Sequence, residues 1–163
     1  MVFMIEKELH GFPGVKIIEL VKHADKRGYF LEVLRKSWVA NNINQVSVSL
    51  TKPGVIKAFH WHNRQQDIWF LLSGVALVGL YDLREDSPGF KKKAAFKLDS
   101  SKNPKLIIIP KKVAHGYKAL GKEPVTMLYA MNEEYNPKDP DEERIPHDDA
   151  EIGFDWDSEP EEI

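Results

Sequence analysis

The chain has 163 residues, a mass of 18.7 kDa, a formal net charge of −2 and no cysteine. It is therefore long enough for one domain with a hydrophobic core, and disulfides and zinc–thiolate sites are excluded. The composition is typical of soluble globular proteins, and no run approaches the roughly 20 apolar residues of a membrane-spanning helix. The N-terminus also lacks a secretory signal. For these reasons we expect a cytoplasmic protein with no membrane partner.

Short apolar segments separated by turn residues predict a structure that is almost entirely β. In chain order, the predicted strands are Val15–Val21, Tyr29–Leu34, Gln45–Thr51, Val55–Trp61, Ile68–Leu72, Ala76–Leu83, Ala94–Leu98, Leu106–Ile109, Tyr117–Leu120 and Val125–Asn132. One short helix is predicted near Ser37–Asn41. Many short strands at regular spacing favour a sandwich or barrel with jelly-roll winding, which can hold one small ligand.

The charge of the chain is distributed unevenly. Residues 139–163 hold 12 acidic residues and one base, whereas residues 1–138 hold 22 bases and 13 acids and carry a net charge of +9. We expect a domain over residues 1–138 and an acidic C-terminal segment that packs on it or trails from it, with Phe154 and Trp156 as anchors. The basic body favours an anionic ligand, and a phosphorylated small molecule is favoured over nucleic acid because no nucleic-acid-binding motif is present.

Three histidines and an aspartate have a spacing that suits metal ligands. His60 and His62 are two residues apart in a predicted strand, so their side chains share one face. Asp67 precedes the next strand, and His115 follows a distant one. Three imidazoles and one carboxylate that converge in a barrel suit Fe(II), Mn(II), Ni(II) or Zn(II). The alternative is a pair of histidines hydrogen-bonded in a polar pocket.

The same residues fall in two motifs. The segment from Gly54 through His60, His62 and Asp67 to Gly74 resembles the first motif of the cupins, in which the carboxylate is usually Glu. Residues 110–115 resemble the second cupin motif. The resemblance implies an all-β double-stranded β-helix, or jelly roll. Cupins occur both with and without a bound metal.

A second resemblance covers about 130 residues. The matching blocks are Asp25–Glu32, Gln45–Ser49, Gly54–His60, Asp82–Pro88, Ile109–Tyr117, Tyr135–Pro137 and Asp149–Trp156. Their order and content resemble the dTDP-4-dehydrorhamnose 3,5-epimerase family. This resemblance implies a dimeric jelly-roll isomerase that works without metal on a nucleotide-linked 4-keto-6-deoxy sugar in polysaccharide biosynthesis.

The family resemblance also implies roles for individual residues. His60 corresponds to the base that removes a proton next to the ketone, and Tyr129 to the acid that returns a proton to the opposite face. Arg27 would reach the diphosphate from the partner subunit. The positions implied to bind substrate are Arg27, Phe30, Glu32, Gln45, Ser47, Lys57, His115 and Tyr135.

Asp67 departs from the family pattern, which has a Lys there to stabilise the enolate oxygen. A carboxylate would repel an enolate, and two hypotheses follow. In the first, one divalent metal ion on His60, His62, Asp67 and His115 polarises the ketone, so that His60 is not the base. In the second, no metal is bound and Asp67 orients His60 or His62.

Two further functions stay open at this point. In the first, the chain is a metal-dependent cupin that catalyses a different reaction, such as oxygenation or isomerisation of a small sugar. The other is non-catalytic binding of a sugar nucleotide.

Overall fold

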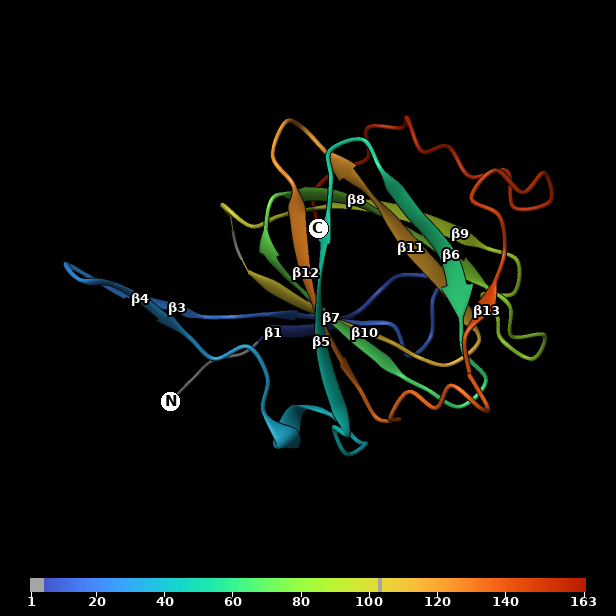
Figure 1. Ribbon diagram of the computed structural model, residues 1–163, viewed down its shortest axis with the longest axis horizontal. Helices are drawn as coiled ribbons and strands as arrows, with labels where there is room; N and C mark the ends of the chain where they lie inside the picture. Colours follow the sequence, from blue (N-terminus) through green and yellow to red (C-terminus); the bar gives the residue numbers. More distant parts are fainter. Residues whose placement is uncertain (1–4, 103) are drawn as a thin grey trace.

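The computed structural model describes residues 5–102 and 104–163, which form two facing antiparallel sheets (Figure 1). The six-stranded sheet has the order β1 (Ile5–Glu8), β2 (Lys16–Glu19), β10 (Lys105–Ile109), β7 (Asp67–Ser73), β12 (Val125–Met131) and β5 (Gln45–Thr51). The five-stranded sheet has the order β13 (Glu143–Arg144), β6 (Ile56–Trp61), β11 (Val113–Leu120), β8 (Val75–Asp82) and β9 (Lys93–Asp99). This arrangement confirms the predicted all-β jelly roll.

The main hydrophobic core lies between the two sheets. It includes Trp69 from β7 and Tyr117 from β11, both fully buried, together with Phe96 from β9. Because successive side chains of a strand point to opposite faces, each sheet also has an outer face to cover.

Two segments of irregular structure cover those outer faces. Residues 31–43, which include the 3₁₀ helix Lys36–Trp38, pack on the six-stranded sheet. The C-terminal segment packs Ile152 and Trp156 on the five-stranded sheet. As a result, β7 is buried over five consecutive residues, Asp67–Leu71, and its first residue can project a carboxylate into the interior.

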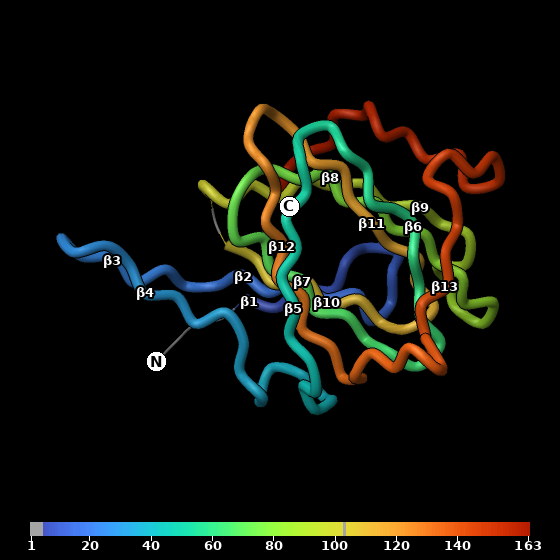
Figure 2. Tube along the Cα trace, viewed as in Figure 1, coloured from blue at the N-terminus to red at the C-terminus, as the bar shows by residue number. Residues whose placement is uncertain are grey.

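The acidic C-terminal segment makes specific contacts along the five-stranded sheet (Figure 2). Strand β13 pairs with β6, and Glu162 forms a β-bridge with Lys97. Gly79 makes room for the anchoring rings, because a Cβ there would lie 2.7 Å from the ring of Phe154 and 2.8 Å from that of Trp156. A larger residue at position 79 would displace these rings.

Two apolar surfaces of the chain are exposed. Hairpin β3 (Lys22–Asp25)–β4 (Gly28–Leu31) projects away from the sheets, and Tyr29 and Phe30 on it are 65% and 64% exposed (Figure 2). Strand β5 lies at an edge of its sheet and turns Val46, Val48 and Leu50 outward. The alternating pattern places Gln45, Ser47 and Ser49 on the inward face of the same strand.

The predicted strands agree with the observed ones to within a few residues, with three exceptions. Strands β1, β3 and β13 were not predicted, and all ten of their residues are exposed. The short helix predicted near Ser37–Asn41 is a 3₁₀ helix that covers only Lys36–Trp38. Within the described part of the chain, no helix is long and apolar enough to span a membrane.

Candidate active site

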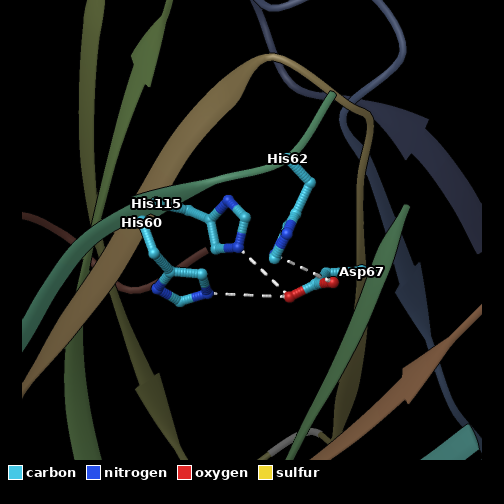
Figure 3. A group of neighbouring side chains, drawn as sticks. All are labelled: His60, His62, Asp67 and His115. Carbon is cyan, nitrogen blue, oxygen red and sulfur yellow. Dashed lines mark hydrogen bonds and ion pairs between the residues drawn. The ribbon is translucent and has the colours of Figure 1, made fainter. Parts of the chain in front are cut away.

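Four side chains from three strands and one turn converge at the inner edge of the five-stranded sheet (Figure 3). His60 lies near the end of β6 and is the cross-strand partner of His115 in β11. His62 follows β6 directly, and Asp67 begins β7 on the facing sheet. The predicted convergence of these four residues is therefore present in the structure.

The carboxylate of Asp67 is at the centre of the group. Its Oδ2 lies 3.2 Å from Nε2 of His115 and 3.8 Å from Nε2 of His60, and its Oδ1 lies 3.6 Å from Nε2 of His62. Burial alone would raise the pKa of Asp67, but the three imidazoles outweigh burial and hold the pKa well below its usual value. Asp67 is therefore ionised, although its side chain is almost completely buried.

Two neighbours that carried no sequence signal hold this carboxylate. The amide nitrogen of Gln65 donates to Oδ1 at 2.6 Å, and the indole nitrogen of Trp69 donates to Oδ2 at 3.2 Å. The same Gln65 nitrogen lies 3.2 Å from Nε2 of His62. Such donors fix the orientation of an ionised group that burial would otherwise destabilise.

Backbone carbonyls fix the ring orientation of two histidines. Nδ1 of His62 lies 2.7 Å from the carbonyl oxygen of Asp141, and Nδ1 of His115 lies 2.7 Å from that of Val113. A carbonyl oxygen only accepts, so both Nδ1 atoms carry the hydrogen and both Nε2 atoms face Asp67. Burial, followed by the nearby His60, lowers the pKa of His115 to about 4.

Asp141 is a positioning residue that the sequence pattern did not reveal. Its carboxylate accepts from the backbone N–H groups of Asn63 at 3.0 Å and of Arg64 and Gln65 at 2.8 Å. These three donors belong to the turn between β6 and β7. Asp141 therefore holds both His62 and the turn that leads to Asp67, from a position almost 80 residues further along the chain.

A cluster of hydroxyl groups lies on the other side of the site. The Tyr129 hydroxyl is 2.8 Å from that of Ser49 and 3.1 Å from that of Tyr117, which in turn is 2.8 Å from that of Thr51. Burial raises the pKa of Tyr129 above its usual value of 10.0. The Tyr129 hydroxyl is therefore protonated at neutral pH and can donate a proton.

Both groups open into one cavity of about 570 Å³. His60 and Tyr129 line it, as do the cationic side chains of Lys57 and Arg144. The volume is in the range of small-molecule sites. His115 is not part of the lining, because it is 1% exposed and lies beside the ring of His60.

The other residues that were expected to bind substrate lie in two places. Gln45 and Tyr135 line an adjoining cavity of about 710 Å³, and the side chain of Gln45 bonds to Ser47 and to the backbone of Tyr135. Arg27, Phe30 and Glu32 lie on or beside the projecting hairpin and do not reach either cavity of their own chain. Arg27 pairs there with Asp25, and Glu32 with Arg35.

Similarity to known proteins identifies the family. The model of the dTDP-4-dehydrorhamnose 3,5-epimerase family matches residues 10–163. The chain belongs to this family. It is an isomerase family, so the resemblance found in the sequence motifs is confirmed.

Similar proteins come from a bacterium and an archaeon. The chain is 48% identical over 147 residues to the spore coat polysaccharide biosynthesis protein SpsL of Bacillus subtilis, covering 90% of this chain and 97% of that protein. It is 40% identical over 148 residues to Agl13 of Haloferax volcanii, a probable low-salt glycan biosynthesis epimerase, covering 89% of this chain and 94% of that protein.

A solved structure supports the same assignment. The crystal structure of a dTDP sugar isomerase from Desulfovibrio desulfuricans G20 matches with a TM-score of 0.83 and 26% identity, over 92% of this chain and 95% of that chain.

Proposed function

We propose that this member of the epimerase family inverts a carbon next to the ketone of a nucleotide-linked 4-keto-6-deoxy sugar. The observation that carries the proposal is that one cavity is lined by both an imidazole, His60, and a protonated phenol, Tyr129. Inversion next to a ketone needs a base that removes the proton and an acid that supplies one, and these two groups have the required chemistry. Family membership favours this reaction over oxygenation and over non-catalytic binding.

His60 takes the proton from the carbon, and the electron pair of that C–H bond moves into the carbonyl group to give an enolate. The ionised Asp67, 3.8 Å away, stabilises the imidazolium that forms. Tyr129 then gives its proton to the same carbon from the opposite face, and the enolate collapses back to the ketone. Lys57 in the cavity wall offsets part of the negative charge that Asp67 would otherwise direct at the enolate, whereas Arg144 in the same wall is paired with Glu142.

The nucleotide diphosphate is proposed to bind beside Lys57 and Arg144 in the wall of the first cavity, where these side chains supply positive charge. The adjoining cavity is less suited to an anion, because carboxylates dominate its lining: Glu133, Glu134, Asp139, Asp141 and Glu142. Gln45, with its partners Ser47 and Tyr135, would supply polar and aromatic contacts to the rest of the nucleotide. The product would enter the synthesis of a surface polysaccharide in the cytoplasm, in keeping with the names of the relatives in Bacillus and Haloferax.

Exchange of substrate hydrogen with solvent tests this function. In D₂O, dTDP-4-keto-6-deoxyglucose should acquire deuterium at C3 or C5 in the presence of the protein, followed by NMR. The matched control is dTDP-glucose, which lacks the ketone and should not exchange, because its C–H bonds have no adjacent carbonyl to hold the charge. Binding of the ketone substrate without any exchange would overturn the proposed function.

The protein is further proposed to act as a homodimer. The outward row of Val46, Val48 and Leu50 lies on an unpaired edge strand, and each of these side chains is about 60% exposed. Such an edge is a template for pairing with another strand. A second copy would cover this row and would bring the projecting hairpin, with Arg27 and Phe30, to the neighbouring cavity.

Disrupting the edge strand should separate the subunits. The native protein should have twice the 18.7 kDa mass of one chain in light scattering at micromolar concentration. Val48→Glu should weaken the dimer at least about tenfold, because the buried interface would hold an unpaired charge. Val55→Glu is the matched control, since Val55 is 43% exposed but lies outside β5. A monomeric native protein, or a dimer unaffected by Val48→Glu, would contradict this proposal.

A further inference from the structure

We propose that His60, His62, Asp67 and His115 bind one divalent transition-metal ion. Each residue offers one ligand atom, and these atoms all lie within 4.8 Å of one another (Figure 3). Three of the four side chains are buried, and His60 is the most exposed of the three that line the cavity, His60, His62 and Asp67. This site shares His60 and Asp67 with the proton-transfer function proposed above, but its test does not depend on that function.

The spacing of the four ligand atoms fits a single ion. Metal–nitrogen and metal–oxygen bonds are about 2.0–2.2 Å long, which places neighbouring ligand atoms about 3–4 Å apart. The three Nε2 atoms lie 3.2, 3.6 and 3.8 Å from the oxygens of Asp67. Two of these distances exceed those of hydrogen bonds, so a direct hydrogen bond joins Asp67 only to His115 among the three histidines.

The orientation of the rings also supports a metal site. In His62 and His115, Nδ1 donates to a backbone carbonyl, which leaves Nε2 of the neutral ring with a lone pair. Both Nε2 atoms face the Asp67 carboxylate, and that of His62 also lies 3.2 Å from the amide nitrogen of Gln65. These nitrogens and the carboxylate oxygens are all potential metal ligands, and a backbone partner at the outer nitrogen is the usual support of a metal-bound histidine.

Protonation of more than one of these rings is unfavourable. Two imidazolium groups in this cluster would be in contact. The ring centroids of His60 and His115 are 4.2 Å apart, and those of His60 and His62 are 5.4 Å apart. Like charges at this separation, largely away from water, repel each other strongly. One ion among four ligands avoids this repulsion.

The donor set narrows the class of metal. Three imidazole nitrogens and one carboxylate oxygen suit Zn(II), Ni(II), Fe(II) or Mn(II), whereas Mg²⁺ and Ca²⁺ favour oxygen ligands. Gln65 and Trp69 already hold Asp67, so the site is supported before an ion enters.

The shared residue His60 links the metal site to the cavity. An imidazole whose lone pair is bound to a metal cannot take a proton with that nitrogen. Metal binding and proton abstraction by His60 therefore exclude each other at this nitrogen, and metal content must be known before rates of different samples are compared.

Metal uptake by the full chain tests the proposal without any substrate. Protein freed of metal with a chelator is titrated with Zn(II), Ni(II) and Mn(II) by calorimetry, and bound metal is counted by elemental mass spectrometry. At least one of these ions should bind at one ion per chain and raise the unfolding temperature, because it binds the folded state. His62→Gln, which removes a ligand but keeps a side chain able to donate to Asp141, should weaken binding at least about 100-fold.

Two controls make the result decisive. His10→Ala removes an exposed histidine outside the cluster and should bind metal as the native protein does. Unfolding of metal-free His62→Gln checks that the variant is folded. The proposal is overturned if none of the ions binds in the micromolar range, or if native protein and folded His62→Gln bind equally. Either result would leave the deuterium-exchange test of the epimerase unaffected.

Discussion

His60→Ala should lower both deuterium exchange and inversion of the sugar by about 10²–10⁴-fold, the usual contribution of a positioned base. The reason is that His60 is the imidazole of the cluster that opens most to the cavity, whereas His115 is buried behind it. Rates of exchange are measured by NMR in D₂O on metal-free protein, so that loss of a metal ligand does not contribute.

Two additional measurements separate loss of the base from loss of structure. Imidazole added to His60→Ala should restore part of the exchange, because the vacated space opens to the cavity. His10→Ala, which changes an exposed histidine far from the site in sequence, should exchange at the native rate. Native exchange by a folded, metal-free His60→Ala protein would assign the base to another residue.

Tyr129→Phe should separate exchange from inversion. With His60 intact, the proton is still removed and a deuteron can return to the same face, so label should enter the starting sugar. Delivery to the opposite face needs the Tyr129 hydroxyl, so formation of the inverted product should fall by about 10²–10⁴-fold. NMR of one reaction mixture reports both quantities.

The surroundings of Tyr129 provide the control for this variant. Tyr81→Phe removes a hydroxyl from another buried tyrosine, one that packs in the core under the C-terminal segment and not in the cavity, and it should leave both rates unchanged. Inversion at the native rate by Tyr129→Phe would exclude Tyr129 as the proton donor. Ser49 and Tyr117, whose hydroxyls lie 2.8 and 3.1 Å from it, would be the next candidates.

The sequence predicted the fold well where strands are apolar. Gln45–Thr51 was predicted with its observed bounds, because hydrophobic and polar residues alternate along it. Strands β1 and β3 were missed, because all four side chains of each are exposed and only backbone pairing with a neighbouring strand defines them. Trp69 carried no signal for its contact with Asp67, since any apolar strand contains such a residue.

The candidate site was predictable only in part. The positions of His60, His62, Asp67 and His115 follow from motif spacing, and the structure brings them together. The contributions of Asp141 and Gln65 do not follow from motif spacing. Asp141 acts through its backbone carbonyl and through the turn that its carboxylate holds, and Gln65 acts through a flexible side-chain amide. An acidic residue in an acidic segment is indistinguishable from its neighbours until the tertiary structure places it.

The contact between Asp141 and the turn after β6 also has a consequence for the order of folding. His62 is made early in synthesis, but the carbonyl that fixes its ring and the carboxylate that holds residues 63–65 are made almost 80 residues later. Every strand of the two sheets except β13 precedes residue 141. A nascent chain can therefore form much of both sheets while its pocket is still unfinished, and the segment around Asp141 completes the pocket once it is made.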